Sequence, residues 1–146
     1  MESMIAADLH PALKPVAFLL GTWRGEGEGQ YPTIKPFLIY TQRTEAIDTG
    51  QPLHGEAGYL RLVGDGRLEF VIAQPIGFAE ISLGRVNGQR IDVECASVGR
   101  TPTAKPVTSI SRSLWLEGET LHYELKMGMG DFPLARHLVA SFRRVD

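Results

Sequence analysis

Two of the chain's four histidines stand where an imidazole could do chemistry. His137 lies in the apolar stretch of residues 133–140, where a charged imidazole would be costly and a neutral one needs a partner. A neutral imidazole can bind a transition metal through either ring nitrogen. His137 is therefore a candidate metal ligand, with a hydrogen-bonded core histidine as the alternative. His54 begins a predicted strand, where it could face either the mouth of a cavity or solvent.

The other two histidines are expected outside such a site. His10 precedes Pro11 and is expected at the surface or as a helix cap, and His122 alternates with charged neighbours and is expected in solvent. The sequence has no His-Glu-x-x-His, no P-loop, no Gly-x-Ser-x-Gly and no Cys/His array with metal spacing. Its carboxylates include no pair that spacing alone places as an acid–base dyad. Function must therefore be inferred from a cavity and from single residues.

Strands are predicted to position these histidines. From Thr22 onward apolar and polar residues alternate with a period of two, and turn residues such as Asn87-Gly88 recur at short intervals. The predicted strands are residues 22–30, 38–47, 53–62, 67–74, 78–86, 90–97, 109–116, 120–127 and 136–145. Before them, Pro11 and Pro15 limit residues 6–20 to short helical turns. Sequential hairpins predict an all-β fold, an antiparallel up-and-down β-barrel of about ten strands, because closure removes exposed sheet edges.

The same alternation predicts which side chains face the interior of the barrel, because residues two apart share a face of a strand. Gln74 follows Ile72 inward, and Met127 belongs to the apolar set of its strand. His137 shares a face with Val139. One amide, one methionine and one histidine are therefore expected to meet in a common apolar lumen.

The glycine-rich stretch of residues 21–27 is predicted to be structural. It alternates like a strand and no helix follows it, so it does not have the pattern of a phosphate-binding loop. Its glycines permit bending and close backbone approach. Trp23 is expected to plug the floor of the barrel.

Composition and charge are those of an ordinary globular protein. The 146 residues carry a formal net charge of −2, and 43% of them are hydrophobic, which is typical of one domain spanning residues 1–146. No cluster of Lys or Arg indicates nucleic-acid binding. The single cysteine, Cys95, excludes an intrachain disulfide and favours a reducing compartment. The apolar run at residues 16–20 is too short for a signal peptide or a membrane span, which predicts a cytoplasmic protein.

Several blocks, in order along nearly the whole chain, resemble the nitrobindin family of haem-binding barrels, which are similar in shape to lipocalins and fatty-acid-binding proteins. The family's Gly-x-Trp-x-Gly-x-Gly stands at residues 21–27 and its Tyr-Pro-Thr-Ile at residues 31–34. The further blocks are residues 40–42, 52–59, 72–74 and 104–105, Met127, and residues 133–138.

The resemblance implies a ferric haem b protein with one haem per chain. His137 would be its catalytic iron ligand. The residues that would line the pocket or contact the haem near its rim are Thr33, Leu53, His54, Gln74, Lys105 and Met127. The implied activity is isomerisation of peroxynitrite to nitrate, together with binding of nitric oxide. The implied partners are these small molecules, and a homodimer stays open.

The alternative function is that of a carrier of a lipid or other small hydrophobic ligand in a metal-free barrel, because barrels of this size enclose ligand cavities. Such carriers usually hold a carboxylate with interior arginines. The arginines here, at positions 24, 43, 67, 85, 112 and 144 among others, mostly alternate with apolar residues in phases that point them outward. This pattern counts against a carrier. An interaction domain is a third interpretation, with no positive feature beyond the fold.

One departure from the family lies after residue 34. Family members carry about fifteen further residues there, which is the length of one more strand, before the strand that contains Tyr-Thr-Gln. Here Phe37 is followed directly by Leu38. Either the strand is truly deleted or the sequence omits a segment of the protein. We expect the second, with a break in the backbone between Phe37 and Leu38.

Overall fold

The computed structural model describes residues 9–29 and 36–146, and the chain forms two compact units, Met1–Ile34 and Lys35–Asp146. The first unit contains a 3-10 helix, η1 (Pro11–Leu19). The ring Nδ1 of His10 accepts a hydrogen bond from the backbone N–H of Ala12 at 3.1 Å, so the predicted helical turns and the predicted cap are confirmed. None of the helices in the described part of the chain combines the length and the apolar character needed to cross a membrane.

The strand predicted at residues 22–30 is wrong over its described part, because residues 22–29 form no strand. Alternation specifies the two faces of an extended segment, but a strand also needs a neighbour that pairs with its backbone N–H and C=O groups. The indole of Trp23 donates a hydrogen bond to the carbonyl of Leu19 at 2.9 Å. The role of Trp23 as a barrel plug and the single-domain organisation both stay predictions.

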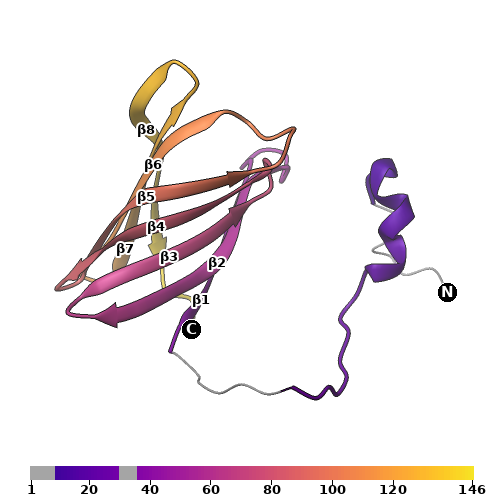
Figure 1. The fold of residues 1–146 in the computed structure, drawn as a ribbon, viewed down its shortest axis with the longest axis horizontal. Coiled ribbons are helices and arrows are strands. Elements are labelled where there is room, and N and C mark those ends of the chain that lie inside the picture. Colours follow the sequence, from indigo (N-terminus) through magenta and orange to yellow (C-terminus); the bar gives the residue numbers. More distant parts are fainter. Residues whose placement is uncertain (1–8, 30–35) are drawn as a thin grey trace. The chain divides into compact units, whose positions relative to one another are not determined.

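Eight strands form the second unit, in one sheet whose spatial order is the order along the chain (Figure 1). The strands are β1 (Leu38–Glu45), β2 (Pro52–Gly64), β3 (Arg67–Gln74), β4 (Phe78–Asn87), β5 (Arg90–Arg100), β6 (Val107–Glu117), β7 (Thr120–Met129) and β8 (Phe132–Arg143). Each strand is antiparallel to the next, and the sheet curls into a half-barrel. The predicted fold class is confirmed, with eight strands in the described residues instead of about ten.

The connections alternate between two ends of this sheet. Turns at residues 65–66, 88–89 and 118–119 lie at one end, which we call the hairpin end. Connections at residues 46–51, 75–77, 101–106 and 130–131 lie at the other, which we call the loop end. At the first hairpin turn Asp65 and Gly66 both have positive φ, 52° and 71°, which is the conformation that a two-residue hairpin requires and that Asp-Gly favours.

Two apolar clusters fill the interior of the second unit. The buried members are Leu68, Phe70, Ile72 and Val93 in one cluster and Phe78, Val107, Ile110, Tyr123, Leu125 and Met127 in the other. In β3 and β7 the buried residues alternate as predicted, and both Gln74 and Met127 are buried.

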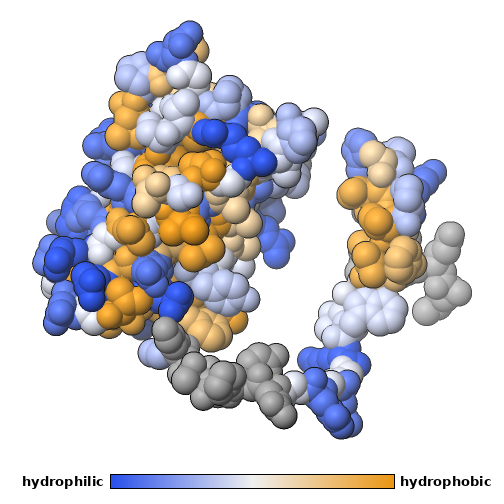
Figure 2. All heavy atoms as spheres, viewed as in Figure 1, coloured by the Kyte–Doolittle hydropathy of each residue, from blue (hydrophilic) through white to orange (hydrophobic). Residues whose placement is uncertain are grey.

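Strands β4 and β6 place charged groups inside. In β4, Glu80 is fully buried while its apolar neighbours Ile81 and Leu83 are 47% and 46% exposed, and hydrophobic residues accordingly reach the surface of the second unit (Figure 2). In β6, Arg112 is buried on the same face as Ile110. The prediction that Arg112 points outward is therefore wrong, because this arginine belongs to the inward phase of its strand.

The expected break after Phe37 is also wrong. The sequence runs directly from Phe37 to Leu38, and Leu38 begins β1 by pairing with Leu60 of β2. The segment is therefore absent from the chain itself.

Close approach of neighbouring strands requires a glycine at position 84. A Cβ there would overlap the backbone of Asp92 and Val93, whereas a Cβ on Gly99 would meet nothing nearer than a carbonyl oxygen 4.0 Å away. We expect Gly84→Ala to lower the free energy of unfolding by about 1–3 kcal/mol and Gly99→Ala to change it by less than about 0.5 kcal/mol. Urea unfolding of both variants measures the difference, and equal stability would contradict this account.

Candidate functional site

A set of hydrogen-bonded polar side chains lies inside the half-barrel, and we call it the buried polar cluster. Its members come from β1, β2, β3, β4, β6 and β7. They are Tyr40, Gln42, Glu56, Gln74, Glu80, Ser82, Arg112 and Tyr123.

Arg112 lies at the centre of this cluster. Its Nη1 donates to Oε2 of Glu80 at 2.6 Å and its Nη2 donates to Oε2 of Glu56 at 2.8 Å. Its Nε donates to the hydroxyl of Tyr123 at 3.2 Å. The side chains of all three charged residues are fully buried. A buried ion pair of this kind is maintained only when hydrogen bonds satisfy the remaining groups, and here every nitrogen of the guanidinium has an acceptor.

Both oxygens of Glu56 are occupied by donors. Besides the bond from Arg112 to Oε2, the hydroxyls of Tyr40 and Tyr123 donate to Oε1 at 2.5 and 3.1 Å. Burial by itself would raise the pKa of Glu56, but the charge and hydrogen bond of Arg112, with the bonds from Tyr40 and His54, lower it below its ordinary value of 4.5. Burial and the nearby Glu56 raise the pKa of Tyr40. Glu56 is therefore a carboxylate, and Tyr40 a neutral phenol, at neutral pH.

Gln74 joins the cluster through Glu80. The amide Nε2 donates to Oε1 of Glu80 at 3.1 Å, and Ser82 donates to Oε2 at 3.0 Å. The amide oxygen, Oε1 of Gln74, is buried and has no hydrogen-bond partner among the described residues. Turning the amide over would place an oxygen against the Glu80 carboxylate, so the observed orientation is the favourable one. Gln74 thus offers a buried acceptor to which no described residue donates.

His54 connects the cluster to a pocket. Its Nε2 lies 3.3 Å from Oε2 of Glu56, and its side chain is 18% exposed. The pocket, of about 370 Å³, is lined by Arg43, Thr44, Glu45, Pro52, Leu53, His54, Gly55 and Pro75. Of the two positions that the sequence left open for His54, the mouth of a cavity is the observed one. Leu53 lines the same pocket and is largely exposed.

His137 lies at an irregularity of β8. Leu125 of β7 pairs with Leu138, but Lys126 pairs with Arg136, so His137 is the extra residue of a β-bulge. Its exposure is high. The period of two predicted the wrong face for this part of β8, because Val139 is 52% exposed and lies outside while Leu138 packs against the core. A bulge resets the alternation of a strand and often re-aims a side chain beside an active site.

Most of the predicted site residues gather at the loop end. These are Leu53 and His54 at the start of β2, Gln74 at the end of β3, Lys105 in the β5–β6 loop and Met127 near the end of β7. Lys105 is exposed, and its backbone N–H donates to the carbonyl of Ile76 at 3.3 Å, which joins two loops of this end. Met127 pairs with Ala135, two residues before His137. Thr33 lies outside the described residues.

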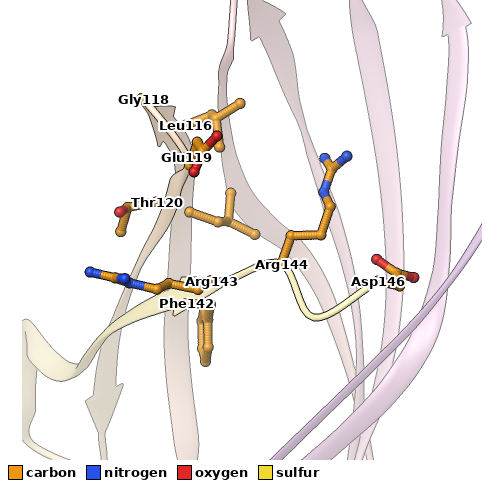
Figure 3. Close-up of a pocket in the computed structure, with 9 residues that line it drawn as sticks. Leu116, Gly118, Glu119, Thr120, Phe142, Arg143, Arg144 and Asp146 are labelled. Carbon is orange, nitrogen blue, oxygen red and sulfur yellow. The ribbon is translucent and has the colours of Figure 1, made fainter.

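A larger hollow of about 1000 Å³ lies at the hairpin end (Figure 3). It is lined by Leu116, Gly118, Glu119, Thr120, Leu121, Phe142, Arg143, Arg144 and Asp146. Arg143 and Arg144 point in different directions (Figure 3), and none of the predicted site residues lines it. Size alone does not identify a site. The loop-end pocket is the better candidate because its histidine is tied to buried charged groups.

The buried polar cluster was not predicted from the sequence. The available signal was the phase of the strands, because Arg112 shares a face with Ile110 and Leu114, and Glu80 shares a face with Phe78. A charged residue within an inward apolar phase is rarely buried unless it is paired. Two such residues of opposite sign in different strands would have predicted an internal pair.

Comparisons with known proteins identify related chains. The family model of the THAP4-like, heme-binding beta-barrel domain matches residues 12–144. Peroxynitrite isomerase 2 of Mycobacterium marinum is 46% identical over 157 residues, covering 94% of this chain and 98% of the relative. Peroxynitrite isomerase of Nocardia farcinica is 43% identical, covering 98% of this chain and 96% of the relative. The crystal structure of Rv2717c from M. tuberculosis is 43% identical with a TM-score of 0.69, covering 95% of this chain and 100% of that chain.

The first of these alignments also reveals missing positions. It spans 157 positions, but 94% of a chain of 146 residues is about 137 residues, so about 20 positions of the relative have no counterpart here. This difference is comparable in size to the segment of about fifteen residues that the family resemblance implies after residue 34.

Removing the charge at the centre of the cluster should be costly. We expect Arg112→Met to lower the free energy of unfolding by about 3–5 kcal/mol, because two buried carboxylates lose their shared cation. The control is Arg61→Met, which breaks a half-exposed pair with Glu69 and should cost no more than about 1 kcal/mol. Chemical denaturation measures both values. Equal losses in the two variants would show that the buried pair is unimportant.

Stability should also depend on pH through Glu56. Because its folded-state pKa is below 4.5, the unfolded state binds more protons than the folded state between the two pKa values, and stability rises with pH there. The difference in unfolding free energy between the parent and Glu56→Gln should be full above about pH 4.5 and shrink as the pH falls through the folded-state pKa. Denaturation curves across this range measure it. A constant difference would contradict the assignment.

Proposed function

The chain belongs to the family of THAP4-like haem-binding β-barrel domains, and from this premise we propose that it is a ferric haem b protein that isomerises peroxynitrite to nitrate and binds nitric oxide. One observation of the chain itself carries the proposal. Each of the other three histidines has a hydrogen-bonded ring nitrogen, whereas the imidazole of His137 has none with any described residue. His137 is thus free to bind an iron.

The residues at the loop end fit a haem group. An imidazole is a common axial ligand of haem iron, and His137 stands on a bulge with both ring nitrogens unoccupied by described residues. Met127 supplies an apolar, polarisable surface close to it in the sheet. Gln74 contributes a buried acceptor without a partner. This donor set matches a flat apolar cofactor with a single strong attachment to the protein.

We assign one haem per chain, held by His137 through one ring nitrogen. Leu53 and Met127 would cover the macrocycle and exclude water, and His54 and Gln74 would be the polar groups beside it. Of these four residues, Leu53 and His54 line the loop-end pocket. Lys105, and Thr33 outside the described residues, would contact the haem near its rim. When bound, ferric haem supplies an open coordination position that acts as a Lewis acid on peroxynitrite and also takes nitric oxide.

The remaining tasks of the chain are few. It must hold the cofactor, keep the imidazole of His137 neutral and leave one face of the pocket open to small molecules. These small molecules, and a second copy of the chain, are the proposed partners. No acid–base dyad is required, which agrees with the solitary position of His137. A single cysteine and the composition of the chain support a location in the cytoplasm.

The carrier function is less well supported than the haem function. A fatty-acid carrier needs an interior cation that is free to bind a carboxylate. Arg112 is an interior cation, but its guanidinium is already bound to Glu56, Glu80 and Tyr123. A fatty acid would have to displace one of these buried carboxylates.

Replacing the proposed ligand tests this function. We expect His137→Ala to abolish the Soret band that the parent gives with stoichiometric hemin, and to reduce peroxynitrite decay to the rate of free hemin, because the single iron–nitrogen bond is lost. The control is His122→Ala on the adjacent strand, where the imidazole stacks on Trp115; this variant should bind hemin like the parent. Absorption spectra and stopped-flow traces provide the measurements.

Circular dichroism shows whether the variants keep their fold. If His137→Ala binds hemin and accelerates peroxynitrite decay like the parent, His137 is not the ligand, and a metal-free carrier takes first place.

A further inference from the structure

The two ring nitrogens of His54 have different surroundings. Nε2 lies 3.3 Å from Oε2 of the buried Glu56, while Nδ1 makes no hydrogen bond with any described residue and belongs to a side chain that lines the loop-end pocket. We propose that Glu56 is a positioning residue that accepts the Nε2–H of His54, so that neutral His54 presents Nδ1 to the pocket as a hydrogen-bond acceptor. This inference deepens the proposed function by specifying which ligands the pocket favours.

The orientation of Glu56 is fixed by three hydrogen-bond donors other than His54. Arg112 donates to Oε2, and Tyr40 and Tyr123 donate to Oε1. Each of these residues comes from a different strand, and the carboxylate side chain is fully buried. Glu56 cannot rotate away from His54 without breaking several buried hydrogen bonds, each expensive to leave unmade.

The fixed carboxylate determines the tautomer of His54. An ionised carboxylate only accepts hydrogen bonds, and Arg112 holds the pKa of Glu56 below its ordinary value in spite of burial. The imidazole nitrogen beside it must therefore carry the proton. In the neutral ring the other nitrogen is then an acceptor. In metal sites, a carboxylate that accepts a hydrogen bond from a coordinating histidine fixes the tautomer of that histidine by the same physics.

Gln74 is oriented in a parallel way by the other carboxylate. Its Nε2 is bound to Glu80, which leaves Oε1 as an unpartnered buried acceptor. Arg112 bridges the two carboxylates. One cation therefore holds both carboxylates, and these determine which atoms of the Gln74 amide and the His54 imidazole act as donors and which as acceptors. His54 at the pocket and Gln74 at the end of β3 thus both present acceptors when His54 is neutral.

Ligand preference follows from this polarity. A neutral ligand, or one that donates a hydrogen bond such as the protonated form of peroxynitrite, is favoured while His54 is neutral. Uptake of a proton by His54 turns Nδ1 into a donor and favours an anion. The charged groups that face His54 are Glu56 with Arg112 behind it, and Arg43 and Glu45 of β1 across the pocket.

Nitrogen-15 NMR of the imidazole rings, on the protein without haem, tests the proposal. In the parent, neutral His54 should be the Nε2–H tautomer. Glu56→Gln should keep this tautomer, because the donors of Arg112 hold the amide oxygen on the His54 side. The nitrogen-15 shift of Nε2 should nevertheless change, because an amide oxygen is a weaker hydrogen-bond acceptor than a carboxylate. His54→Gln identifies the signal by its disappearance.

The matched control is Glu80→Gln. It removes a buried carboxylate from the same guanidinium but makes no hydrogen bond with His54, so it should leave the nitrogen-15 shifts of His54 close to those of the parent. Equal changes of these shifts in the two variants, or an Nδ1–H tautomer in the parent, would overturn the proposal. If Glu56→Gln does not fold, the tautomer of the parent decides.

The proposal about His54 and the proposed haem function can fail independently of each other. The tautomer is measured without haem, so an Nδ1–H result leaves hemin binding by His137 intact. Loss of hemin binding would likewise leave the tautomer of His54 as measured.

Discussion

The structure depends on the sharing of one buried guanidinium between two buried carboxylates. Arg112 of β6 is bound to Glu56 of β2 and Glu80 of β4, and the surrounding hydroxyls and amides extend this contact to six of the eight strands. A slip of one residue in any of the three strands would turn its charged group to the other face and leave an uncompensated charge inside. The interaction therefore selects one strand register among those that the apolar residues alone would permit.

The same interaction connects the core to the loop end of the sheet. Glu56 reaches the loop end through His54, and Glu80 reaches it through Gln74. This arrangement explains why β4 turns Glu80 and Ser82 inward and leaves Ile81 and Leu83 half exposed. Burial of two leucine-sized side chains would contribute roughly 1.5–3 kcal/mol each. The sheet gives up that stability to orient polar groups.

The sequence predicted best where one face of a strand is wholly apolar. Strands β3 and β7 have such faces, so Gln74 and Met127 were placed inward correctly. Phase failed in β6, because internal pairing reverses the rule that charged residues lie outside, and the two carboxylate partners of Arg112 lie 32 and 56 residues away. It failed in β8 because the bulge at His137 resets the alternation. Residues 22–29 alternate like a strand, but alternation carries no information about a partner.

The chain is shorter than its relative, but the residues of its proposed site are all present in the sequence. About 20 positions of a relative have no counterpart, and β1 and β8 stand at the two ends of the sheet order. Of the residues proposed to hold the cofactor, Lys105 lies in the β5–β6 loop, and those on strands lie on β2, β3, β7 and β8. The carboxylates Glu56 and Glu80 lie on β2 and β4. A shorter wall changes how much of the pocket meets solvent but removes none of these groups. Any weakening of haem binding relative to longer family members should therefore come from water reaching the iron side of the pocket, and not from a missing ligand.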